Sequence, residues 1–279
     1  MDIFETLVRD MGRLWSKYGH LYMQGIGSTL ILALIATFLG CVIGFACGVL
    51  NTIPCSRRDP LIRRFGLKSL CILIRVYVEV FRGTPMVLQA VFIYYGLPYF
   101  SQNAFRFESV WAAAILIVSI NTGAYMTESV RGGILSVDPG QTEGAKAIGM
   151  THVQTMTQVI LPQAFRNILP QIGNNFIINV KDTSVMFVIS FTELFAVHRY
   201  VVGVNNMYFP SAAIEMIAYL TMTLSASLLL RWLEKRIDGP DSYQLAMEDP
   251  LVMTAGIYTY PRRICDCEAQ SSGAQNRGG

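Results

Sequence analysis

The chain has 279 residues, of which 52% are hydrophobic and only 15% are charged. Soluble globular domains carry about 25% charged residues, so this composition excludes an ordinary water-soluble fold. The net charge of +3 comes without a concentrated basic face, and no nucleic-acid partner is expected. Stretches long enough to cross a bilayer as a helix, about 20 apolar residues each, recur along the chain. The sequence therefore predicts an all-α integral membrane protein.

The hydrophobic pattern predicts five membrane spans. In chain order they lie at about 21–50, 69–99, 110–135, 168–195 and 212–232. The second is the least regular, because Arg75, Glu79 and Arg82 in its first half suit the lipid headgroups better than hydrocarbon. Its buried part is expected to begin near Gly83, where Gly and Pro85 indicate a broken helix.

These spans divide the chain into three predicted parts. Residues 1–20 form an amphipathic segment on the outer surface, because the start mixes charges and lacks the apolar core of a signal peptide. Residues 21–237 form the transmembrane domain. Residues 238–279 form a cytoplasmic tail, partly disordered, in which the apolar spacing lapses. The scattered cysteines and histidines predict neither a disulfide framework nor a metal site.

The distribution of Lys and Arg predicts the orientation. The loop after the first span is rich in basic residues, whereas the loop after the second holds only Arg106. The basic residues of the first loop are Arg57, Arg58, Arg63, Arg64 and Lys68. Cytoplasmic loops carry the excess of Lys and Arg, so the first loop is expected inside, with the N-terminus outside and the C-terminus cytoplasmic.

Glycines at four-residue spacing mark one face of the first span. Gly40, Gly44 and Gly48 would let another helix approach closely. The partner helix could belong to the same chain or to another subunit, and packing within the chain is the favoured interpretation.

The connection between the third and fourth spans, residues 132–170, is too long and too patterned for a simple turn. Asp138-Pro139-Gly140 is expected to end the third span, and residues 142–148 to form a short helix. Gly149 would then permit a turn that bulkier residues resist. Thr151 is expected to cap a second helix that Pro162 ends. The pattern predicts a cytoplasmic docking element, with an amphipathic surface loop as the alternative.

This connection resembles the EAA loop of ATP-binding-cassette (ABC) importer permeases, by which the membrane subunit engages its ATPase. The resemblance rests on Glu143-Gly144-Ala145, Gly149 and Ile160-Leu161-Pro162. It departs from the family at Gly144, where Ala is usual. The loop so identified covers about residues 138–165, and the resemblance implies ATPase coupling by Gln141, Glu143, Gly144, Ala145, Gly149, Leu161 and Pro162.

Four further stretches resemble the polar-amino-acid branch of that family: residues 78–98, 125–133, 140–149 and 179–184. The resemblance implies a five-helix permease of the type I importer kind, in the bacterial inner membrane and in contact with membrane lipid. It would form a dimer with itself or with a related permease, bind two ATPase subunits, and receive its amino acid from an extracytoplasmic binding protein. The chain carries no phosphate-binding loop of its own, so ATP is expected on the ATPase subunit and no cofactor on this chain.

Polar residues inside the spans predict a substrate path. Lys181 and Asp182 lie in an otherwise apolar stretch, where each charge facing lipid would cost about 2.5 to 3.5 kcal/mol. Opposite charges of this kind suit the carboxylate and amino groups of a zwitterionic amino acid. The predicted path contains Lys181, Asp182, Asn179, Asn175, Asn121 and Gln89. The alternative is structural, since buried polar groups also bond to neighbouring helices.

Two other functions are alternatives to amino-acid import. A permease for another small polar solute would show the same spans and loop. A lipid-modifying membrane enzyme would need converging acid, base or metal ligands, whereas the acidic residues here are spread along the chain. We therefore expect a transport subunit that is not itself an enzyme.

Overall fold

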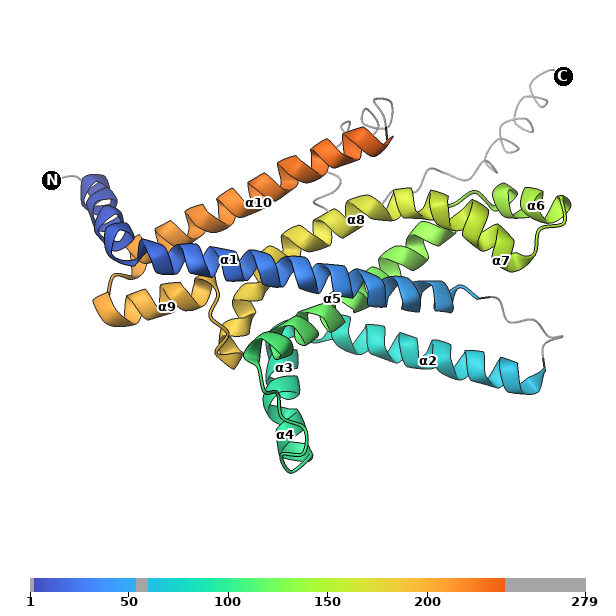
Figure 1. Cartoon of the computed structure of the whole chain (residues 1–279), viewed down its shortest axis with the longest axis horizontal. Coiled ribbons are helices and arrows are strands. Elements are labelled where there is room, and N and C mark those ends of the chain that lie inside the picture. The colour runs from blue at the N-terminus through green and yellow to red at the C-terminus, as the bar shows by residue number, and fades with distance from the viewer. Residues whose placement is uncertain (1–2, 54–59, 239–279) are drawn as a thin grey trace, which may run out of the picture. The chain divides into compact units, whose positions relative to one another are not determined.

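The structure is a computed structural model that describes residues 3–53 and 60–238. The chain divides into two compact units, Met1–Glu234 and Lys235–Gly279, and the helical architecture below is that of the first (Figure 1). The ordered elements of the described residues are all helical. In chain order they are α1 (Ile3–Asn51), α2 (Leu61–Gly83), α3 (Met86–Val91), a π-helix (Phe92–Gly96), α4 (Leu97–Phe100), α5 (Val110–Leu135), α6 (Pro139–Ala147), α7 (His152–Gln154), a second π-helix (Thr155–Ile160), α8 (Leu161–Asp182), a 3₁₀-helix (Thr183–Ile189), α9 (Leu194–Asn205) and α10 (Tyr208–Asp238). The predicted all-α class is confirmed.

Three helices of the described chain are long and apolar enough to cross a membrane: α1, α5 and residues Tyr208–Arg236 of α10. A fourth crossing is made if His152–Ile189 and Leu194–Asn205, which meet at 53°, count as one bent span. The predicted second span is divided. Its first part, α2, carries too many charges to count as a membrane-spanning helix. Its second part, Met86–Phe100, is an apolar helix of fewer than 18 residues. The break lies where Gly83 and Pro85 indicated it.

The predicted N-terminal segment and first span form one continuous helix, α1. Its first turns lie at an angle to the remainder (Figure 1). Leu14, Tyr18 and Tyr22 are buried in a cluster with residues of α9 and α10, including Val197 and Ile214. The boundary expected near residue 20 therefore falls inside α1, because these buried side chains tie its N-terminal turns to the membrane domain.

The glycine face of α1 packs against α5. A Cβ on Gly40 would lie 2.6 Å from Thr122 Cβ, and one on Gly48 would lie 2.7 Å from Val130 Cβ. A Cβ on Gly44 would overlap Met126. Only residues without a side chain allow two helices to approach so closely. The prediction that these glycines pack within one chain is confirmed, and α5 becomes the central helix of the fold.

The helix that follows the docking element does not end at Pro162, and that prediction is wrong. The chain stays helical from His152 through Asp182. A proline lacks an N–H, and its ring clashes with the carbonyl four residues earlier in an α-helix. Here a π-helix, Thr155–Ile160, precedes it, and Leu161 N–H bonds back to Met156 O. This wider turn accommodates the proline, so the helix of the fourth span begins well before Ile168.

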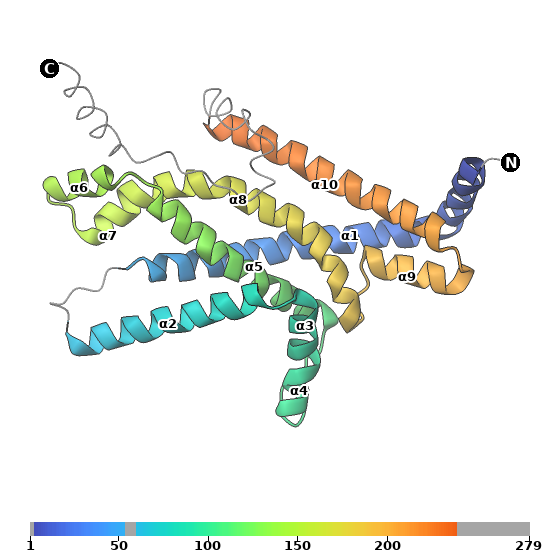
Figure 2. The same ribbon diagram turned by 180° about the vertical axis from the view of Figure 1, so that it is seen from behind.

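The two views agree on which segments share an end of the first unit. The α6–α7 element lies at the same end as the start of α2, whereas the N-terminus of α1 and α9 lie at the other (Figures 1 and 2). This grouping is consistent with the predicted topology, in which the basic first loop and the docking element share one side of the membrane. Which side is cytoplasmic stays a prediction.

Candidate functional site

The docking element is a helix closed by a glycine turn. Asp138 caps α6, its side chain accepting a 2.7 Å hydrogen bond from Gly140 N–H. At the other end Gly149 has φ +83°, and Met150 N–H bonds to Ala145 O at 3.1 Å while Gly149 N–H bonds to Lys146 O at 3.0 Å. These two bonds form a Schellman motif, in which a left-handed residue satisfies the last carbonyls of the helix. The predicted turn at Gly149 is confirmed, and it has the positive φ that bulkier residues resist.

The second half of the element is fixed by a capping box. Thr151 Oγ1 accepts from Gln154 N–H, and the Gln154 side chain accepts in return from Thr151 N–H at 2.9 Å. The result is the predicted helix, turn and helix. Ile148, beside the turn, is 79% exposed, so the element presents an apolar tip at the surface.

The residues predicted to couple with an ATPase divide into two groups. Ala145 is buried, and Leu161 is half-buried and packs against the cluster of α5 and α8 residues that includes Ile134 and Ala164. Leu161 thus helps to hold the element to the membrane domain. The others are exposed: Gln141, Glu143, Gly144, Gly149 and Pro162.

Two of the predicted path residues on α8 are buried and hydrogen-bonded. Asn179 Nδ2 donates to Thr37 Oγ1 of α1 at 2.8 Å, and Thr122 Oγ1 of α5 donates to Asn179 Oδ1 at 3.1 Å. Asn175 Nδ2 donates to Gln171 O of its own helix at 2.8 Å and to Met126 Sδ of α5 at 3.3 Å. Their amides therefore join helices within the chain, the arrangement that the structural interpretation of these residues requires.

Gln89 and Asn121 meet at the break between α2 and α3. Asn121 Nδ2 donates to Gln89 Oε1 at 2.9 Å. Gln89 Nε2 in turn reaches Phe81 O at 2.8 Å and Thr84 O at 2.9 Å. Phe81 and Thr84 lie beside Pro85, so the two amides satisfy carbonyls that a broken helix leaves free. The sequence pattern pointed to these residues, and the structure brings them together.

Lys181 and Asp182 are the last two residues of α8. Lys181 is exposed and Asp182 is half-buried. Within residues 3–53 and 60–238, neither side chain has a hydrogen bond or ion-pair partner. In this respect the two charges differ from the four amides, which are hydrogen-bonded within the described chain.

A buried polar cluster at α1, α9 and α10 was not predicted. Tyr22 OH lies 2.7 Å from Ser211 Oγ, and His198 Nδ1 lies 2.9 Å from the same oxygen and 3.5 Å from Glu215 Oε2. No group of three or more potential ligand side chains is arranged to hold a metal ion in the described part of the chain. The cluster was missed because its members are far apart in sequence and stand singly in apolar stretches.

Glu193, next to this cluster, fixes the start of α9. It is fully buried, and its carboxylate accepts 2.7 Å hydrogen bonds from Phe195 N–H and Ala196 N–H. Tyr219 OH of α10 donates to it at 3.0 Å. Glu193 therefore caps α9 at the bend of the fourth span and ties that bend to α10.

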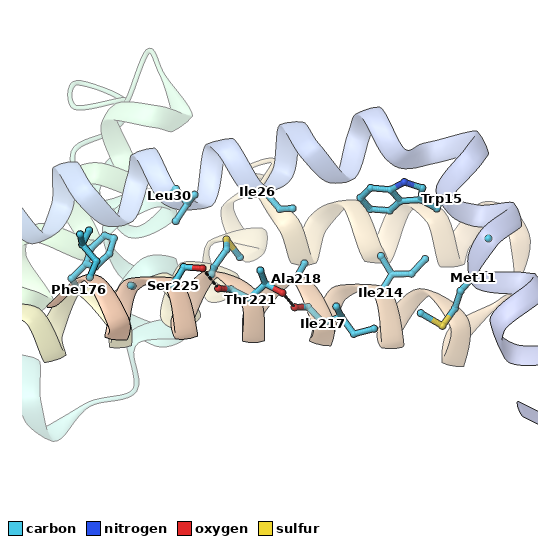
Figure 3. A pocket seen from close by; sticks show the side chains of 14 residues that line it. Met11, Trp15, Ile26, Leu30, Phe176, Ile214, Ile217, Ala218, Thr221 and Ser225 are labelled. Carbon is cyan, nitrogen blue, oxygen red and sulfur yellow. Dashed lines mark hydrogen bonds between the residues drawn. The ribbon is translucent and has the colours of Figure 1, made fainter. Parts of the chain in front are cut away.

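A groove of about 750 Å³ lies between α1 and α10 (Figure 3). Trp15 and Leu30 line it from α1, and Ile214 and Ala218 line it from α10. The hydroxyls of Thr221 and Ser225 bond to backbone carbonyls of α10 and offer little to a ligand. An ionised amino acid would find no partners for its charges there, and a buried unpaired charge is strongly unfavourable. The groove is unsuited to a zwitterionic substrate.

Known proteins resemble the chain over most of its length. Residues 65–239 match the family described as the binding-protein-dependent transport system inner membrane component. The chain is 35% identical to the glutamine transport system permease protein GlnP of Escherichia coli (strain K12), over 82% of this chain and 97% of GlnP. It is 29% identical to the arginine transport system permease protein ArtQ of Bacillus subtilis (strain 168), over 78% of this chain and 93% of ArtQ.

Solved structures agree with this. A crystal structure of an amino acid ABC transporter with histidines contains a chain with 35% identity and a TM-score of 0.69, covering 79% of this chain and 96% of that one. The inward-facing MetNI methionine ABC transporter shares the fold, with 21% identity and a TM-score of 0.59 over 79% and 96% of the two chains. The chain therefore belongs to the family of binding-protein-dependent transport system inner membrane components.

Proposed function

We propose that this chain is the permease through which an ABC importer moves a polar amino acid across the bacterial inner membrane. Membership of the family makes it a multi-pass membrane component of an import system and not an enzyme. The amino-acid substrate is supported by relatives whose names specify glutamine and arginine. The observation that carries the proposal is the pair of opposite charges at the end of α8, which have no hydrogen-bond or ion-pair partner among the residues that the structure describes.

In the proposed site, the Lys181 ammonium meets the substrate carboxylate, and the Asp182 carboxylate meets its amino group or a cationic side chain. Adjacent residues on a helix point about 100° apart, so the two groups can address different parts of a ligand. Asn179, Asn175, Asn121 and Gln89 complete the proposed path. Their hydrogen bonds within the chain suit them to shape its wall.

In the proposed coupling, the exposed face of the α6–α7 element docks on a cytoplasmic ATPase subunit that binds ATP. Glu143 and Gly144 present a polar, sterically open surface, and nothing lies within 4 Å of a Cβ placed on Gly144. Ile148 adds an apolar contact. Such a surface on a rigid, doubly capped element is suited to transmit a movement of the ATPase to α8.

The proposal also includes the other components and the orientation. An extracytoplasmic binding protein delivers the amino acid, and a second permease subunit, identical or related, completes the membrane unit. The N-terminus lies outside and the C-terminus inside, which the basic residues of the first loop support. Residues 1–20, 21–237 and 238–279 keep their proposed roles as surface segment, membrane domain and cytoplasmic tail.

The test is ATP hydrolysis by the full permease reconstituted in proteoliposomes with its ATPase. We expect hydrolysis to rise when the binding protein is added with its amino acid, and to stay low with the unloaded protein. A rate of ATP hydrolysis that does not change when the loaded binding protein is added would contradict the proposal. Stimulation by a small polar solute other than an amino acid would favour the alternative permease function.

A further inference from the structure

A small pocket of about 320 Å³ lies where the loop before α5 meets the end of the 3₁₀-helix. Its lining residues include Tyr94 and Tyr95 of the first π-helix, Arg106 and Phe107 of the loop, and Ser190. Pockets that hold small molecules start at about 300 Å³, so this volume suits a compact solute. The groove between α1 and α10 is apolar, whereas this pocket, the Arg106 pocket, combines aromatic rings with a full positive charge.

Contacts between the aromatic side chains fix the walls of the Arg106 pocket. Tyr94 stacks on Phe107 with ring centres 6.1 Å apart and an angle of 11° between the planes. Tyr95 meets Tyr94 edge to face, with ring centres 4.9 Å apart. Tyr95 OH also donates a 3.1 Å hydrogen bond to Val188 O of the 3₁₀-helix, 93 positions later. Segments far apart in the sequence are therefore joined at the pocket within the chain itself.

Arg106 supplies a positive charge that nothing in the described chain balances. No hydrogen bond or ion pair engages its exposed side chain within residues 3–53 and 60–238. It is the only basic residue of the loop, which lies outside in the proposed orientation, where the bias of membrane proteins does not favour arginine. A guanidinium presents a planar set of donors that fits a carboxylate through two parallel hydrogen bonds. A carboxylate is therefore the expected partner.

Ser190 links the Arg106 pocket to the proposed substrate path. Asp182 ends α8, the 3₁₀-helix Thr183–Ile189 follows it, and Ser190 comes next with φ +63°. At about 2 Å per residue, this seven-residue helix is about 14 Å long. Residues other than glycine rarely adopt the left-handed conformation, and those that do cluster at ligand sites. The pocket thus lies one short helix away from the charges of the proposed site.

We propose that the Arg106 pocket is an outer subsite, which holds the amino acid before it reaches Lys181 and Asp182. The inference rests on the proposed function, from which it takes the class of substrate. The Arg106 guanidinium binds the carboxylate, and the ammonium group lies against an aromatic face of the pocket. An ammonium group within about 6 Å of a ring centre is attracted by the electrons of the ring. Both contacts use groups that all amino acids share, so the subsite accepts amino acids with different side chains.

Protection of an introduced cysteine tests the subsite. The full permease, with its native cysteines replaced, is reconstituted with its ATPase, and Ser190→Cys is labelled with a small uncharged thiol reagent without binding protein or ATP. Glutamine and arginine are the probes, and each should slow the labelling. Arg106→Gln should raise the concentration for half-protection about ten- to a hundredfold, because a hydrogen bond to a charged group is lost. Pro98→Cys, which also lines the pocket, is the second reporter if Ser190→Cys does not incorporate.

Four controls accompany this measurement. Asn103→Cys, exposed in the same loop but outside the pocket, should react equally fast with and without amino acid. Arg131→Gln removes an exposed positive charge elsewhere and should leave the protection unchanged. Arg106→Lys keeps the charge but loses the bidentate geometry, so its half-protection concentration should lie between those of wild type and Arg106→Gln. Agmatine, which is arginine without its carboxylate, should not protect.

Equal protection in Arg106→Gln and wild type, or equal protection at Asn103→Cys and Ser190→Cys, would overturn the inference. So would labelling that responds to phosphatidylglycerol in the vesicles and to neither amino acid, because the pocket would then hold a lipid headgroup. An importer that responds to its loaded binding protein, but shows no protection at Ser190→Cys, refutes the subsite and leaves the proposed function standing. Protection without that response gives the reverse.

Discussion

Asn179 on α8 and Thr37 on α1 are joined by a 2.8 Å hydrogen bond from Asn179 Nδ2 to Thr37 Oγ1. The same amide exchanges hydrogen bonds with Thr122 on α5. All three residues are buried, so three helices meet at one polar contact in an apolar interior. In lipid a hydrophobic driving force between helices is absent, and contacts of this kind help to fix which helix faces meet.

Replacing Asn179 with Leu should destabilise the permease. The change leaves the hydroxyls of Thr37 and Thr122 without their shared partner, and interhelical hydrogen bonds in membranes contribute about 0.6 kcal/mol each, up to about 1.7. We expect a loss of about 1 to 3 kcal/mol, measured as a lower midpoint of thermal unfolding in detergent. Asn174→Leu, on the exposed side of the same helix, is the control. Equal midpoints for the two variants would show that Asn179 does not hold the helices together.

Adding one methyl group to Gly44 should also destabilise the fold. An Ala Cβ there overlaps Met126 of α5, and it also lies 2.8 Å from the Met126 carbonyl carbon, so the helices must move apart. Overpacking of a tight interface costs about 1 to 3 kcal/mol. Gly27→Ala, on the same helix, meets nothing within 4 Å and should be neutral or stabilising. The comparison is the midpoint of thermal unfolding, and a Gly44→Ala variant as stable as Gly27→Ala would be inconsistent with the close packing of α1 on α5.

The turn at Gly149 should tolerate Asn but not Val. Space around the residue is open, so the restriction comes from its φ of +83° and not from a neighbour. A left-handed conformation costs about 1 to 2 kcal/mol for an ordinary residue, more for a β-branched one, whereas Asn adopts it readily. We expect Gly149→Val to insert normally but to lose ATPase stimulation by the loaded binding protein, and Gly149→Asn to keep it. Full stimulation of Gly149→Val at equal abundance would argue against a coupling role for this turn.

The sequence predicted most of the helices because their signals are local. Apolar runs located α1, α5 and α10, and the turn at Gly149 followed from a residue that alone suits a positive φ. The glycine spacing of α1 indicated a packing face. The partner helix, α5, could be identified only from the structure, because the spacing of glycines describes one helix and not the helix that packs against it.

The errors have a common physical cause, which is tertiary context. Pro162 indicates a helix end, yet the preceding π-helix accommodates it and the chain stays helical through the proline. Glu128 pairs with Arg82, 46 positions earlier on α2. Contacts between residues so distant in sequence are decided by how helices cross, which the local pattern does not encode. Glu193 and His198 escaped notice for the same reason.

Labelling of introduced cysteines tests the proposed orientation. A membrane-impermeant thiol reagent applied to sealed cells should reach Asn103→Cys, in the loop before α5, and miss Gln154→Cys, in the docking element. The excess of basic residues in the first loop is the reason for this expectation. The native cysteines are first replaced, and permeabilised cells serve as the control in which both positions react. Labelling of Gln154→Cys in sealed cells would invert the orientation.

Neutralising Lys181 or Asp182 should weaken transport with little effect on folding. Neither side chain has a hydrogen-bond or ion-pair partner in residues 3–53 and 60–238, so removing either charge breaks no such contact there. A hydrogen bond to a charged group contributes about 1.5 to 3 kcal/mol, so we expect Asp182→Asn and Lys181→Gln each to lower substrate transport by about ten- to a hundredfold.

The measurement is amino-acid uptake into proteoliposomes at saturating binding protein and equal incorporation of each variant. Basal ATPase activity should persist, because the docking element precedes α8 and these charges lie at the other end of that helix. Binding-protein docking is also expected to persist. Lys68→Gln, an exposed lysine of α2, controls for the loss of one positive charge and should transport normally. For an amino acid with a cationic side chain, Asp182→Asn should lower uptake more than Lys181→Gln does, because only the aspartate attracts that side chain. Normal uptake by both variants, with an unchanged order of preference among amino acids, would mean that the charges are structural and that the substrate is bound elsewhere.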